Sequence, residues 1–128
     1  MYITYQGHKI KIYVLDEIPG GNYLGLTLWY NHRHGRYTGA AVLLEKPVSL
    51  HVIVHEAQHV ACNIIYWDNP RDKAIRLLSL YADRDGAQEN LATMTHEIFE
   101  KIVKVIGFNA DNVKRCWADS PPPNKFIG

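Results

Sequence analysis

The two histidines in the sequence His55-Glu56-Ala57-Gln58-His59 have the spacing of two ligands for one metal ion. Residues four apart on an α-helix lie one above the other on the same face, so both imidazoles can reach a single ion. Glu56 follows the first histidine and is close enough to contact a water molecule at that ion. The pattern predicts a zinc site in which His55 and His59 bind the metal and Glu56 acts as general base toward the water.

A catalytic zinc site of this kind needs a third protein ligand and leaves the fourth position to water. From the residues alone, His96, Asp85 and Cys62 are possible third ligands. His96 is seven residues after Glu89, on the same helix face, and is alternatively a catalytic residue that stabilises the transition state, or a surface residue. Asp85 equally fits a helix cap. Cys62, seven residues after His55, equally fits a small buried apolar residue.

The motif and its setting resemble the zincin metallopeptidases, in which a small twisted sheet precedes an H-E-x-x-H helix and a later helix carries the third ligand. The stretch Glu89-Asn90-Leu91-Ala92 matches the E-x-x-A pattern of the gluzincin type, although Thr93 stands where some members have Asp. The residues after His59 lack the Gly and third His of the metzincins. The resemblance implies Zn²⁺ bound by His55, His59 and Glu89, and a protein or peptide substrate. The short chain is also similar to small zincin-like proteins borne by phages or prophages.

Apolar spacing divides the chain into strands followed by helices. Alternation with period two predicts strands over residues 2–5, 9–15, 24–30 and 37–44. Apolar residues at helical spacing predict helices over 48–66, from 70 onward, and over 87–106, with Gly107 as the stop. The expected fold class is α+β, a small mostly antiparallel sheet followed by the H-E-x-x-H helix and further helices. We expect one zincin-like domain over residues 1–120 and an extended Pro-rich tail over 121–128.

Three further features of the sequence are candidates for contacts with a substrate. The strand over 37–44 precedes the active helix, and its resemblance to the zincin edge strand predicts that it binds an extended peptide by strand addition. His32-Arg33-His34 is either a solvated hairpin tip or a loop over the cleft. The eight tyrosines, among them Tyr66 and Tyr81, are candidates for a phenol that stabilises an oxyanion. We expect His8 and His51 to be structural or exposed.

Composition excludes several classes of protein. The chain has 128 residues, 47% of them hydrophobic and 21% charged, as in globular domains. A net charge of +1 gives no global attraction to nucleic acid or to anionic membranes. Because Met1–Tyr5 lacks a basic stretch followed by an apolar one, we expect no signal peptide and a cytoplasmic location. Two cysteines, Cys62 and Cys116, are too few for a disulfide framework.

These observations favour a zinc-dependent hydrolase that acts on peptide bonds, with His55, His59 and Glu89 as ligands and Glu56 as general base. A different class of function keeps the same fold and metal site in a catalytically silent module that binds or inhibits a macromolecule. A third hypothesis treats the motif as a coincidence in a domain without metal. The sequence does not indicate the oligomeric state.

Overall fold

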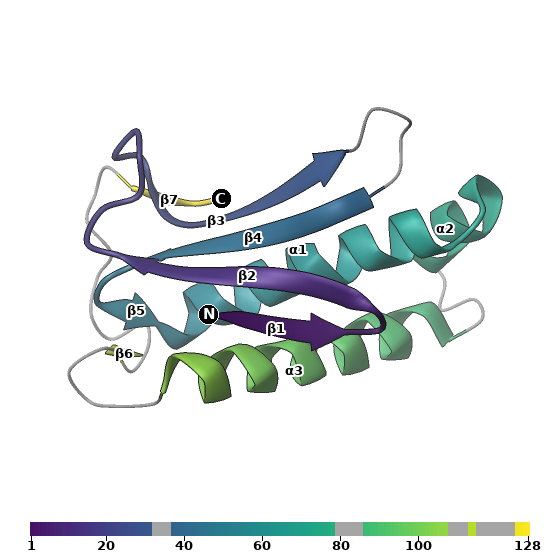
Figure 1. Cartoon of the computed structure of the whole chain (residues 1–128). Coiled ribbons are helices and arrows are strands. Elements are labelled where there is room, and N and C mark those ends of the chain that lie inside the picture. The colour runs from purple at the N-terminus through teal and green to yellow at the C-terminus, as the bar shows by residue number, and fades with distance from the viewer. Residues whose placement is uncertain (32–36, 79–85, 108–112, 115–124) are drawn as a thin grey trace.

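The computed structural model describes residues 1–31, 37–78, 86–107, 113–114 and 125–128. Four strands come first and three helices follow, with short strands between and after them (Figure 1). In chain order the elements are β1 (Tyr2–Tyr5), β2 (His8–Leu15), β3 (Tyr23–Asn31), β4 (Tyr37–Glu45), β5 (Val48–Ser49), α1 (Leu50–Asp68), α2 (Arg71–Leu78), α3 (Ala87–Ile106), β6 (Val113–Lys114) and β7 (Phe126–Ile127).

The main sheet has five strands in the order β1-β2-β4-β3-β7. The pairs β1–β2 and β3–β4 are antiparallel, whereas β2–β4 and β3–β7 are parallel. The predicted α+β class, with a sheet followed by the H-E-x-x-H helix, is confirmed. Each of the four predicted strands and three predicted helices has a counterpart, and α3 ends at Ile106 before Gly107, as expected.

The prediction that residues 37–44 form a peptide-binding edge is wrong. Strand β4 lies inside the sheet, because β2 pairs with one side of it and β3 with the other. A strand paired on both sides has no free backbone groups to offer to a peptide. Strand β3 lies next to β4 in the sheet. The side of β3 that faces away from β4 pairs with β7.

Helices α1 and α3 pack against the sheet and against each other (Figure 1). On β2, Ile10 and Ile12 are fully buried while Lys9 and Lys11 are exposed, as the alternation predicts. The facing side chains of the helices are apolar residues at helical spacing, among them Ile53, Ala57, Val60, Ile64, Ile98 and Ile102. Burying the apolar face of α1 in this way fixes which of its side chains face the sheet and which face solvent.

The last described residues extend the sheet. Phe126–Ile127, which the sequence analysis assigned to the extended tail, pair with the outer side of β3. In Figure 1, β7 lies along β3 on the side of the sheet opposite β1. Among the described residues, no helix is long and apolar enough to cross a membrane.

Candidate metal centre

His55 and His59 turn their rings toward each other from successive turns of α1. Their Nε2 atoms are 3.1 Å apart, and the ring centroids are 4.8 Å apart. Two zinc–nitrogen bonds of about 2.0–2.1 Å at a tetrahedral angle separate the two nitrogens by about 3.3 Å. The observed separation is close to this value, so the pair fits two ligands of one zinc ion.

Glu56 lies on the buried side of the same helix. Its side chain is 0% exposed, and Thr27 Oγ1 donates a hydrogen bond of 2.8 Å to its Oε1 atom. Among the described residues, no group hydrogen-bonds to the buried Oε2 atom. Burial raises the pKa of Glu56 to about 7, and the hydrogen bond from Thr27 acts in the opposite direction. A carboxyl group with this pKa can both accept and return a proton near neutral pH.

Strand β3 supplies the space for this carboxylate. A Cβ atom on Gly25 would lie 2.5 Å from Val52 Cγ1 and 2.9 Å from Glu56 Oε2. Gly25 and Thr27 are two residues apart on β3 and share the face that meets α1. Neither residue belongs to a sequence motif that predicts a role in the site. The available signal is that small side chains at 25 and 27 alternate with Leu24, Leu26 and Leu28, which indicates that another element approaches that face closely.

Burial and the neighbouring imidazole of His59 both lower the pKa of His55, and a hydrogen bond to the Gly128 backbone raises it. A lowered pKa favours the neutral imidazole at neutral pH, which is the form that binds a metal. The two imidazoles are spaced to share one metal ion, and the same helix carries the Glu56 carboxylate, whose Oε2 atom has no partner among the described residues.

Among the described residues, no third metal ligand lies beside this pair of histidines. No group of three His, Cys, Asp or Glu side chains in that part of the chain is arranged to hold a metal ion. Glu89 is exposed on the first turn of α3. Cys62 packs against the hydrophobic core, and burial raises the pKa of its thiol, which disfavours the thiolate that a metal needs. Glu89 as a ligand stays a prediction, and Asp85 lies outside the described residues.

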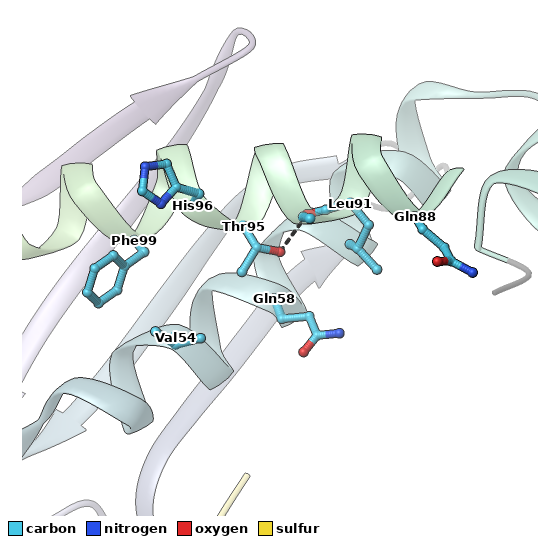
Figure 2. Close-up of a pocket in the computed structure, with 8 residues that line it drawn as sticks. Val54, Gln58, Gln88, Leu91, Thr95, His96 and Phe99 are labelled. Atoms are coloured by element: carbon cyan, nitrogen blue, oxygen red, sulfur yellow. Dashed lines mark hydrogen bonds between the residues drawn. The ribbon is translucent and has the colours of Figure 1, made fainter. Parts of the chain in front are cut away.

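His96 lies on α3 in a groove between that helix and α1 (Figure 2). Val54 and Gln58 line the α1 side of this groove. Each of these residues precedes a histidine of the pair by one position, so the groove and the pair lie on helix faces about 100° apart. His96 Nε2 is 3.0 Å from Glu100 Oε1, and both side chains are largely exposed. The structure therefore gives His96 a partner on its own helix, and its catalytic role stays a prediction.

The remaining candidates have separate surroundings. Tyr66 is exposed and contacts the Trp67 ring edge-on, with ring centroids 5.0 Å apart. His8 is structural, as expected, because its Nε2 lies 2.8 Å from an oxygen of Asp68 and so ties β2 to the end of α1. The predictions for His32, His34 and Tyr81 concern residues outside the described part of the chain.

Comparison of the whole chain with known protein families, with curated protein sequences and with solved structures finds no match.

The contact of Gly25 with α1 can be tested by adding one methyl group. We expect Gly25→Ala to lower the free energy of unfolding by about 2 kcal/mol, because the new Cβ would overlap Val52 and the Glu56 carboxylate. Gly39→Ala is the matched control, since a Cβ there meets no described atom within 4 Å. Urea unfolding of both variants measures the difference. Equal stability of the two variants would contradict the close approach of β3 and α1.

The raised pKa of Glu56 predicts a pH dependence of stability in the metal-free protein. Between pH 4.5 and about 7 the carboxyl group is protonated when folded and ionised when unfolded, so stability falls as pH rises through this window. In Glu56→Gln this fall is absent. We therefore expect the free energy of unfolding of the wild type to fall, relative to that of the variant, by on the order of 2 kcal/mol between pH 4.5 and pH 8. Unfolding in a chelator measures both proteins, and parallel pH profiles would show that Glu56 is not buried as a neutral acid.

Proposed function

We propose that this protein is a metal-dependent hydrolase of peptide bonds, with His55 and His59 as zinc ligands and Glu56 as general base. The observation that carries the proposal is the 3.1 Å approach of the two Nε2 atoms on the helix that also carries the fully buried Glu56 carboxylate, whose Oε2 atom has no hydrogen-bond partner among the described residues. The buried Glu56 carboxylate supports the proposal further, because burying it costs free energy that a purely structural role does not explain.

Each residue has a separate task in this proposal. When bound, zinc supplies Lewis acidity, which lowers the pKa of a water and polarises the substrate carbonyl. The Glu56 carboxylate accepts a proton from the attacking water as the new C–O bond forms. It then delivers that proton to the amine nitrogen as the C–N bond breaks. Thr27 donates a hydrogen bond to the Oε1 atom, and we assign the proton transfer to Oε2, which has no hydrogen-bond partner among the described residues.

A catalytically silent binding module is the second candidate. It is favoured by one observation, that the described residues supply two imidazoles but no third acidic, thiol or imidazole ligand beside them. In this reading the zinc-binding helix presents a surface to a macromolecular partner and turns over no substrate. Glu89 distinguishes the two candidates, because a zincin-like hydrolase needs a third ligand and the resemblance assigns that role to Glu89.

Metal content tests the ligands directly. We expect about one zinc per chain in wild-type protein purified without an affinity tag, and none in His59→Ala. Glu89→Ala should bind zinc at least 10-fold more weakly if Glu89 is the third ligand. Gln58→Ala is the control, because Gln58 is an exposed neighbour of His59 on the same helix. Mass spectrometry measures the metal, and zinc retained in His59→Ala would contradict the assignment.

Hydrolysis tests the role of Glu56. We expect zinc-loaded Glu56→Gln to keep its metal and to cleave unfolded casein at least 100-fold more slowly than wild type, because the amide cannot accept the proton of the water. Gln58→Ala should cleave at the wild-type rate. Fragments measured by mass spectrometry report cleavage. An unchanged rate in Glu56→Gln would rule out Glu56 as the base, and a metal-loaded wild type without cleavage would favour the binding module.

A further inference from the structure

Strand β7 covers the side of β3 that faces away from β4. The Phe126 amide donates a hydrogen bond of 2.8 Å to the Asn22 carbonyl, and the Gly128 amide donates one of 2.9 Å to the Gly25 carbonyl. Without these residues, this part of β3 would present unpaired backbone groups at the edge of the sheet. Such an edge binds extended peptides by strand addition.

The covered edge is next to the candidate metal centre. The carbonyl of Gly25 binds the Gly128 amide, and the Cα of the same residue lies against the Glu56 carboxylate. His55 also forms a hydrogen bond with the Gly128 backbone. A chain that pairs with this edge in the same direction as β7 therefore brings its backbone to the helix that carries the histidines and the base.

An ion pair anchors the segment at its other end. Lys125 Nζ lies 2.6 and 2.7 Å from the two carboxylate oxygens of Glu45. Glu45 is 7% exposed and the Lys125 side chain is 22% exposed, so the pair is largely shielded from solvent. Beyond it, the strand has two residues, and the Phe126 side chain is 69% exposed. The segment is thus held by one charge pair, a few backbone hydrogen bonds and the partial burial of Ile127 against the core, with little apolar burial from Phe126.

We propose that residues 125–128 occupy the peptide-binding edge of β3 as an intramolecular competitor, and that a peptide substrate binds in their place. This inference rests on the proposed function, because the competitor matters only if the edge leads to a working site. A segment in the same chain competes with a free peptide at an effective concentration that the length and stiffness of the connecting residues set. Substrates must displace it, so extended peptides are favoured over small molecules that cannot replace its backbone hydrogen bonds.

Two substitutions at one exposed position test the competition. Phe126→Pro removes the amide that donates to Asn22 and leaves the core unchanged, because the Phe126 side chain lies in solvent. Phe126→Ala keeps this donor and removes the same side chain, so it is the matched control. The double variant Lys125→Ala with Phe126→Pro also removes the ion pair with Glu45. We expect it to give the same results as Phe126→Pro alone.

The first readout needs neither metal nor turnover. A capped peptide with the sequence of residues 125–128, Lys-Phe-Ile-Gly, is added to metal-free protein, and shifts of the Tyr23 and Gly25 amide signals report binding. We expect about 10-fold tighter binding to Phe126→Pro than to the wild type, and wild-type affinity in Phe126→Ala. Hydrogen exchange at the Gly128 amide reports in the same samples whether the segment has left β3. Unchanged peptide affinity in variants whose Gly128 amide exchanges freely would overturn the proposal.

The second readout is hydrolysis of unfolded casein by zinc-loaded protein. We expect KM to fall about 10-fold in Phe126→Pro with kcat unchanged, since the variant alters access and not chemistry. Peptide binding without any cleavage would refute the proposed function and leave the competition intact. Cleavage with the same KM in wild type and in variants whose segment has left β3 would support the function and overturn the competition.

Discussion

The burial of the Glu56 carboxylate between α1 and β3 is the constraint that organises this molecule. A carboxyl group that is 0% exposed loses the hydration of its charged form, and the one described hydrogen bond, from Thr27, compensates only in part. The result is a pKa near 7 and an oxygen without a described partner. Such an arrangement is unfavourable for stability alone, and a pKa near neutrality suits the role of general base that we propose for Glu56.

The same constraint determines the orientation of α1 and the composition of β3. With Glu56 and Val52 against the sheet, the helical period turns His55 and His59 away from the core toward the outer side of β3. Close approach of the helix needs a glycine at position 25. Because the outer side of β3 pairs with β7, the residues that end the described chain lie beside the histidines although they are about 70 positions away in sequence. Sheet order thus connects the site to the segment that covers it.

Local patterns in the sequence predicted the elements and the central motif, because alternation, helical spacing and the stop at Gly107 depend on residues close together in the chain. The order of the strands depends on pairing between distant segments, and no local signal shows that β3 rather than β4 lies beside β7. The role of Lys125 was equally hidden, since its partner Glu45 is 80 residues earlier. Thr27 and Gly25 could be found only as small residues in a leucine-rich strand. The third ligand was assigned by resemblance, and the described residues do not bring Glu89 to the histidines.

The proposed function requires that one zinc ion binds between His55 and His59, on the helix that carries Glu56. The most direct measurement is an anomalous diffraction map recorded at the zinc absorption edge from crystals of the zinc-loaded protein. We predict one strong peak about 2.0–2.1 Å from the Nε2 atoms of both histidines, with a third protein ligand and a water completing a tetrahedron. The same map identifies the third ligand, be it Glu89 or another residue. A zinc-loaded crystal with no peak between these two nitrogens would contradict the account.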